Sequence, residues 1–193
     1  MEDDFVSREK KILSILEQEI EDGEQMTAAV RKIAEQMLLG EKGYLPGDIR
    51  KNVVFDVVLG SETAKSFVDF LISVDGMIAM VIKCAAGSLN SRERHVVAAA
   101  RVLGDFQIPV AVVMDPMNAV VLDGVTGKMT GEGFEAIPKK EQIRRMLSGI
   151  SLVPLRPEKA EREKRVLLAF DAIRCCIPRG ADGGVPLGGV SEE

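Results

Sequence analysis

Two charged residues stand inside apolar segments that a predicted Asp75-Gly76 turn would connect. Asp69 interrupts the apolar run 67–74, and Lys83 lies near the end of the run 77–84. Burying an unpaired charge costs a protein several kcal/mol, so buried charges are paired or coordinate a metal. A carboxylate and an ammonium on neighbouring strands therefore predict a salt bridge or a reaction centre.

The two predicted strands set a condition for Asp69 and Lys83 to share a face of the sheet. Polarity favours a shared face, because strand alternation places both residues opposite the most apolar positions. A two-residue turn at Asp75-Gly76 would instead pair Asp69 with Ile82 and place the two charges on opposite faces. A shared face therefore requires a three-residue loop or a β-bulge.

The motifs around this hairpin resemble the core of the PD-(D/E)XK nucleases, in which an Asp precedes a hairpin whose second strand ends in acidic-x-Lys. Over residues 25–130 the chain is similar to the N-terminal nuclease domain of type I restriction enzyme R subunits. The similar segments are Glu41-Lys42-Gly43-Tyr44, Asp48-Ile49-Arg50, Val68-Asp69-Phe70, Val81-Ile82-Lys83-Cys84, Ser91-Arg92-Glu93-Arg94 and Ile108-Pro109-Val110-Ala111-Val112. The resemblance implies an α/β fold with a restriction-endonuclease-like mixed β-sheet core flanked by helices, with extra N- and C-terminal helices.

The resemblance also implies a metal-dependent site. In this superfamily the strand Asp and the acidic residue hold a divalent metal, and the Lys positions or activates the attacking water. Asp69 and Lys83 are thus the expected catalytic residues, and Asp69 with the backbone carbonyl of Ile82 would hold Mg²⁺ weakly. Val81 stands at the acidic position and offers no oxygen ligand to a hard cation. The metal site is therefore expected to be incomplete.

Two residues of the following helix are candidate accessory groups. Glu93 could reach over the end of the Lys83 strand, although an acid near a helix N-terminus also stabilises the helix dipole. His95, the only histidine, could act as a base near neutral pH, although a lone helical histidine is more often structural. Residues 27–31 offer no acid where the family has a glutamate in its first helix.

The composition limits how this chain could bind nucleic acid. It has 193 residues, a net charge of −5, 4% aromatic residues and no Trp, which argues against a platform for base stacking. DNA binding would require a concentrated basic surface. The candidates are Arg92, Arg94 and Arg101, in a possible patch with Lys139, Lys140, Arg144 and Arg145. Ordinary solvated helix faces are the alternative interpretation of these arginines.

The sequence predicts neither a membrane span nor a signal peptide, because it lacks a run of 18 apolar residues and begins with an acidic segment. A cytoplasmic location is expected. The three cysteines lack the paired Cys-x-x-Cys spacing of a conventional zinc site.

We expect four segments along the chain. They are an N-terminal helix over 1–23 that ends at Asp22-Gly23, a restriction-endonuclease-like domain over 24–150, a C-terminal helical extension over 151–177 and a disordered tail over 178–193. In the extension, the charged half 158–165 is expected to face solvent. The apolar half 166–173 must pack on its own core or on a second copy, so a homodimer stays open.

Three interpretations of function remain open at this point. The favoured one is a restriction-endonuclease-like domain whose incomplete metal site leaves it weakly active or inactive on DNA. The second is an active Mg²⁺-dependent DNA endonuclease using Asp69 and Lys83. The third is a non-catalytic module that binds a protein or ligand on the same fold. The expected partners are DNA and other restriction-modification-like subunits.

Overall fold

The computed structural model describes residues 2–171, with side chains from residue 21 onward, and folds them around one six-stranded mixed sheet. The strand order is β1-β2-β3-β4-β5-β6; β3 and β4 run parallel, and every other neighbouring pair is antiparallel. The strands are β1 Ile49–Leu59, β2 Glu62–Val74, β3 Met77–Cys84, β4 Val110–Met114, β5 Ala119–Asp123 and β6 Met129–Glu132. The predicted α/β class with a mixed sheet is confirmed.

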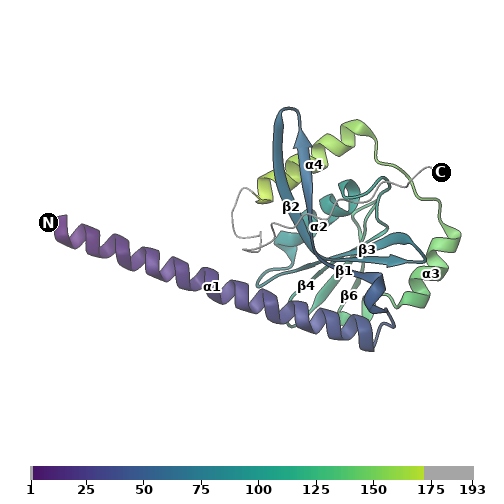
Figure 1. Cartoon of the computed structure of the whole chain (residues 1–193), viewed down its shortest axis with the longest axis horizontal. Helices are drawn as coiled ribbons and strands as arrows, with labels where there is room; N and C mark the ends of the chain where they lie inside the picture. The colour runs from purple at the N-terminus through teal and green to yellow at the C-terminus, as the bar shows by residue number, and fades with distance from the viewer. Residues whose placement is uncertain (1, 172–193) are drawn as a thin grey trace.

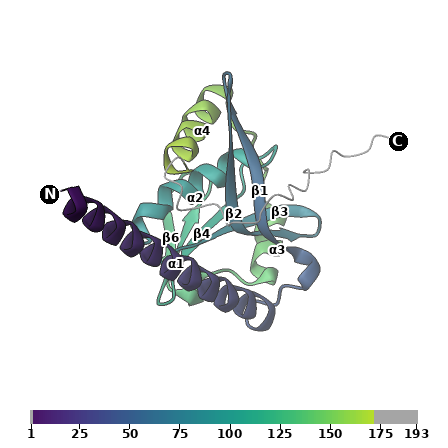
Figure 2. The same ribbon diagram turned by 60° about the vertical axis from the view of Figure 1, so that its left-hand side comes forward.

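Helices cover both faces of this sheet (Figures 1 and 2). The helices are α1 Glu2–Gly40, α2 Asn90–Val102, α3 Lys140–Gly149 and α4 Pro157–Asp171, and short 3-10 turns span Pro46–Asp48 and Phe134–Ala136. Residues of α1 and α3 share one apolar core with the sheet, and residues of α2 and α4 share a second core on the other face. Among the described residues, no helix is long and apolar enough to cross a membrane.

The predicted end of the first helix at Asp22-Gly23 is wrong, because α1 runs without a break from Glu2 to Gly40. A glycine inside a helix costs only about 1 kcal/mol relative to alanine, which good helix formers on both sides outweigh. The hydroxyl of Thr27 also bonds back to the Gly23 carbonyl at 2.9 Å, within the continuous helix. The first part of α1 extends away from the sheet (Figure 1).

The β2–β3 hairpin meets the condition that the sequence set. Its turn has two residues, Asp75 at φ 52° and Gly76 at φ 82°, as a type I′ turn requires. The register then shifts at a β-bulge between Ile72 and Ser73, so that Phe70 pairs with Ile82. The bulge that a shared face for Asp69 and Lys83 requires is therefore confirmed.

The helix of the C-terminal extension packs on its own chain. Leu167 of α4 is fully buried in the core that contains α2, as expected for docking within one molecule. The predicted solvent exposure of the charged half is wrong at Glu163, which is only 2% exposed because two arginines of α2 surround it. The rest of the predicted extension, 172–177, and the predicted disordered tail lie outside the described residues.

Candidate functional site

Asp69 and Lys83 meet in the interior of the sheet. Continuing the register from the Phe70–Ile82 pair places the two residues opposite each other on β2 and β3. The Lys83 ammonium lies 4.0 Å from Oδ2 of Asp69, and the two residues are 2% and 0% exposed. The structure therefore brings together both predicted catalytic residues.

A third residue, Arg31 of α1, completes this charge cluster. Its Nε donates to Oδ1 of Asp69 at 2.5 Å, while the backbone N–H of Cys84 donates to Oδ2 at 2.8 Å. The Arg31 side chain is 25% exposed, so it connects the fully buried Asp69 carboxylate to the protein surface. Both oxygens of the Asp69 carboxylate thus accept a hydrogen bond from the protein itself.

The sequence did not predict a role for Arg31, because the family resemblance calls for an acid within residues 27–31 and Arg31 is a base. Arg31 lies next to Val30 and three residues before Ala34, both of which are fully buried against the sheet. A basic residue directly beside the buried stripe of a helix is a signal that could have found it, because its charge needs a counter-ion near the core.

Lys83 is held in place by its own surroundings. Its ammonium donates to the Phe67 carbonyl at 3.2 Å and lies 3.0 Å from the centroid of the Phe67 ring, a cation–π arrangement. With Asp69 nearby, these contacts compensate a charge that would otherwise be costly to bury.

The donor set around Asp69 does not fit a hard divalent cation. Mg²⁺ requires near-octahedral oxygen ligation, and here one carboxylate is present, with both oxygens engaged. Val81 is buried in an apolar core, and Ile82 lies within the sheet between its partners on β2 and β4. Within the part of the chain described with side chains, no three His, Cys, Asp or Glu residues are grouped to hold a metal.

Cys84 beside the cluster is not a poised nucleophile. Burial, and next the negative charge of Asp69, raise the pKa of its thiol far above the ordinary value. The thiolate that nucleophilic chemistry needs is therefore disfavoured at this position.

The two accessory candidates lie elsewhere. Glu93 lines a cavity of about 300 Å³ beside α2 and the β5–β6 turn. His95 is fully buried, with its Nε2 3.1 Å from Oδ1 of Asp171 and the ring of Phe170 edge-on at 5.5 Å. Neither is among the residues that contact Asp69.

The arginines predicted to bind nucleic acid differ from one another in their surroundings. Arg101 is buried and donates to the carbonyls of Gly124 at 3.0 Å and Val125 at 2.8 Å. Its third contact is Glu163 of α4 at 2.7 Å, and Arg94 approaches the same carboxylate at 2.6 Å. Arg92 is half-buried near the start of α2. Arg94 and Arg101 therefore face a carboxylate of their own chain.

The pKa of Glu163 reflects this environment. Burial acts to raise it, but the hydrogen bonds and positive charges of Arg94 and Arg101 outweigh burial and hold the pKa below the ordinary glutamate value. Glu163 is thus stabilised as a carboxylate.

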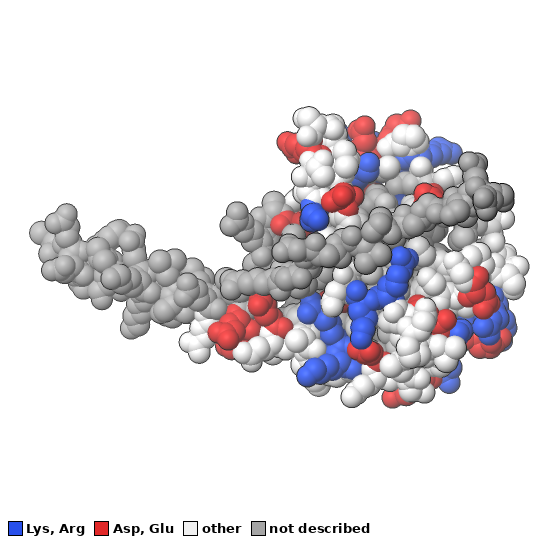
Figure 3. Space-filling model, viewed as in Figure 1, with Lys and Arg blue, Asp and Glu red and all other residues white. Residues whose placement is uncertain are grey.

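A basic region surrounds the outer side of the Asp69 cluster. Figure 3 shows Lys and Arg side chains gathered where α1 crosses the sheet. Lys51 of β1 contacts Glu35 of α1 at 3.0 Å, and Lys32 is exposed next to Arg31 on the same helix. These two lysines lie near Arg31 although the chain carries a net negative charge.

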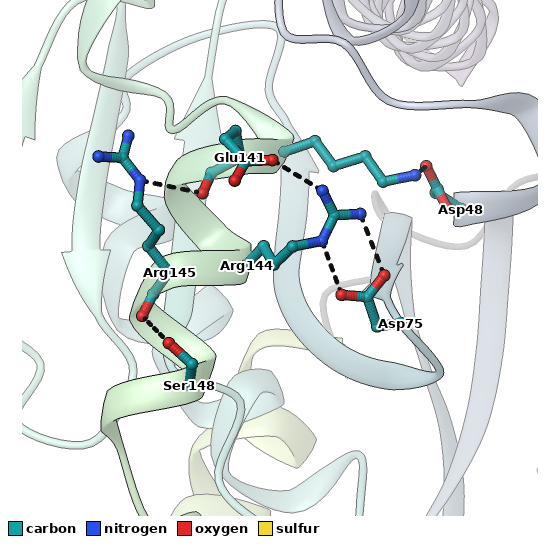
Figure 4. Close-up of polar contacts among 7 residues, drawn as sticks. Asp48, Asp75, Glu141, Arg144, Arg145 and Ser148 are labelled. Carbon is teal, nitrogen blue, oxygen red and sulfur yellow. Dashed lines mark hydrogen bonds and ion pairs between the residues drawn. The ribbon is translucent and has the colours of Figure 1, made fainter.

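Surface ion pairs fix the hairpin turn and the 3-10 turn to α3. Arg144 contacts Asp75 through two nitrogens, at 2.8 and 3.1 Å, and also reaches Glu141 (Figure 4). Hydrogen bonds from Arg144 lower the pKa of Asp75. Burial acts to raise the pKa of Asp48, but its hydrogen bonds with Lys140 and the Leu45 N–H hold the pKa below its usual value. The exposed Asp75–Arg144 contact and the half-buried Asp48–Lys140 contact connect the hairpin turn and the 3-10 turn to α3.

The comparisons with known proteins agree with the motifs. The family model of the type I restriction enzyme R protein N terminus matches residues 27–138, which is more than half of the chain. No curated protein and no solved structure gives a significant match.

Proposed function

Because this chain belongs to the family of type I restriction enzyme R protein N termini, we propose that it is a non-cleaving member of that family. The observation that carries the proposal is the contact between Arg31 and Asp69, in which a guanidinium lies against the carboxylate that would hold the catalytic metal. The domain keeps a nuclease-like scaffold, works in the cytoplasm and contributes binding instead of phosphodiester hydrolysis.

Arg31 neutralises Asp69 without supplying metal chemistry. A guanidinium stays protonated and offers fixed N–H donors, so it balances the charge of a buried carboxylate well. It cannot lower the pKa of a bound water or bridge the attacking and leaving oxygens as a divalent metal does. With Val81 in place of an acid, the cluster provides electrostatic stability and lacks the means to generate hydroxide.

The proposed role is contact with DNA within an assembly of restriction-modification-like subunits. The basic side chains of α1 and β1 support it, since Lys32 follows Arg31 on α1 and Lys51 of β1 contacts Glu35 of the same helix. Duplex DNA is bound largely by neutralising its phosphates, for which a local cluster suffices even on an acidic protein.

An active nuclease is the second candidate. It is favoured by the distance of 4.0 Å between the Lys83 ammonium and Asp69, because the two catalytic side chains of the superfamily are already adjacent. In that case Arg31 would have to leave Asp69 when metal and DNA bind.

A cleavage assay separates the two candidates. The full chain is incubated with Mg²⁺ or Mn²⁺ and with duplex or single-stranded DNA, beside Asp69→Asn. We expect no cleavage above the variant and no Mn²⁺ binding by titration calorimetry. Cleavage by the wild type that disappears in a folded Asp69→Asn protein would reject the proposal.

A double variant tests the role of Arg31 directly. Arg31→Gln combined with Val81→Glu frees Asp69 and adds the missing carboxylate, so Mn²⁺ affinity should increase. Lys32→Gln combined with Val81→Glu is the matched control, because Lys32 is exposed on the same helix. Equal Mn²⁺ affinity in the two folded double variants would show that Arg31 does not exclude the metal.

A further inference from the structure

A pair of arginines on α2 is occupied by one carboxylate from the C-terminal helix. Arg94 lies 2.6 Å from Oε2 of Glu163, and Arg101 lies 2.7 Å from Oε1. The Glu163 side chain is 3% exposed, against 46% for Arg94 and 8% for Arg101. Two arginines converging on separate oxygens of one anion is an arrangement that also suits a phosphate group.

The docking of α4 depends on few buried side chains. Glu163 and Leu167 are its buried residues, Asp171 at its end contacts the buried His95 at 3.1 Å, and a segment without helix or strand, 150–156, precedes the helix. Val166 and Leu168 add partly buried apolar contacts. An interface with a single fully buried apolar residue at its centre relies strongly on its ion pairs.

We propose that α4 is an autoinhibitory strap, in which Glu163 covers a surface of α2 that binds the phosphate backbone of DNA. Release of α4 exposes Arg94 and removes the counter-ion of Arg101, and docking of α4 excludes the phosphate. This role of α4 is separate from the Asp69 site and does not depend on whether that site cleaves DNA.

The space beside the arginine pair supports this role. The cavity of about 300 Å³ next to α2 is lined by Arg94 and Arg101 together with the polar side chains of Asn90 and Thr126. Glu93 also lines it and disfavours an anion deep inside, so the phosphate is expected at the position that the Glu163 carboxylate holds. The internal carboxylate and the external phosphate therefore compete for the same two guanidinium groups.

The first test compares Glu163→Gln with Glu161→Gln in the full chain. Both variants remove one negative charge from α4, but Glu161 is exposed and pairs only with Arg165 on its own helix. Affinity for a labelled DNA duplex is measured by fluorescence anisotropy over a range of salt concentrations. Glu163→Gln should bind about tenfold more tightly at low salt, with a log–log salt slope steeper by about two, one unit for each arginine released. Glu161→Gln should match the wild type.

Hydrogen exchange measures release of the strap itself. The amides of α4 should exchange faster in Glu163→Gln than in the wild type, while those of β3 and β4 should be unchanged. Adding Arg94→Gln to Glu163→Gln should remove about half of the gain in salt slope. Faster exchange of α4 without tighter DNA binding would overturn the proposal, as would unchanged exchange and unchanged binding.

Leu167→Ala loosens α4 by a different route and covers the case in which Glu163→Gln does not fold. It removes buried apolar contacts and leaves every charge in place. Released Arg94 and Arg101 should then bind DNA more tightly, by a factor that increases as salt is lowered. A folded Leu167→Ala protein with faster α4 exchange and wild-type DNA affinity would overturn the proposal.

Discussion

Two buried carboxylates in this protein have the same electrostatic surroundings. Asp69 lies between Lys83, which is buried, and Arg31, whose side chain is 25% exposed. Glu163 lies between Arg101, which is buried, and Arg94, whose side chain is 46% exposed. Each unit places one acid between two bases and leaves one of the bases accessible from solvent.

The two units differ in how the backbone holds them. Asp69 also accepts the Cys84 N–H, and its position follows from a bulged register between two interior strands. Glu163 accepts only side-chain donors and comes from a helix beyond the family-matched region. The comparison indicates that the first cluster is a fixed part of the core, whereas the second is an interface that can open.

The largest expected effect follows from Asp69→Ala. The change leaves two cations and a backbone N–H without their acceptor inside the sheet, which should lower the free energy of unfolding by about 3–5 kcal/mol. Urea denaturation followed by circular dichroism measures this loss.

Asp56→Ala is the control on the neighbouring strand. Asp56 is exposed and lies opposite Lys65 in the β1–β2 pair, so its removal should change the free energy of unfolding by at most about 1 kcal/mol. If Asp69→Ala were as stable as Asp56→Ala, Asp69 would not be a structural ion pair, and the contrast between the two clusters would fail.

The second effect is an acid-induced release confined to α4. The folded-state pKa of Glu163 lies below its ordinary value of 4.5, so its ionisation stabilises the docked state above that pH. This stabilisation should be lost as the pH falls below about 4.5 and through the folded pKa. Hydrogen exchange of residues 157–171 against pH, in the wild type and in Glu163→Gln, measures it.

The variant should lack the part of this pH dependence that comes from Glu163, because glutamine does not titrate, while the His95–Asp171 contact is present in both proteins. If α4 in the wild type stayed protected down to the pH at which the sheet unfolds, the Glu163 cluster would be as fixed as the Asp69 cluster.

Local patterns predicted the frame of the Asp69 site well. The polarity of β2 and β3 around the Asp75-Gly76 turn required a three-residue loop or a bulge, and the structure contains a bulge. The crossover from β3 through α2 to the parallel β4 also follows from the order of apolar segments.

The partners of the buried charges could not be predicted in the same way. Arg31 is 38 residues from Asp69 along the chain, and Glu163 is 62 residues from Arg101. Periodicity within a segment carries no information on which distant helix covers it. The charged pattern of 158–165 is typical of a solvent-facing helix, and only the position of α2 turns Glu163 inward.

The smallest effect is expected at the exposed contact between Asp75 and Arg144, which links the hairpin turn to α3 (Figure 4). Arg144 lowers the pKa of Asp75. At pH values above the ordinary pKa of that carboxyl, Asp75→Asn should therefore have a slightly lower melting temperature than the wild type. The difference from the wild type should vanish as the pH falls through the folded pKa, where the wild type loses the same charge.

Salt distinguishes this exposed pair from the two buried clusters. At about 1 M salt the Debye length falls to about 3 Å, so the difference between Asp75→Asn and the wild type should disappear in thermal melts. Asp69→Ala should remain destabilised under the same conditions, because Lys83 and the Cys84 N–H are buried and salt does not screen them. A salt-independent effect at Asp75 would mean that the two hydrogen bonds from Arg144 stabilise the conformation of the turn. The hairpin that carries Asp69 would then depend on contacts with α3 as well as with α1.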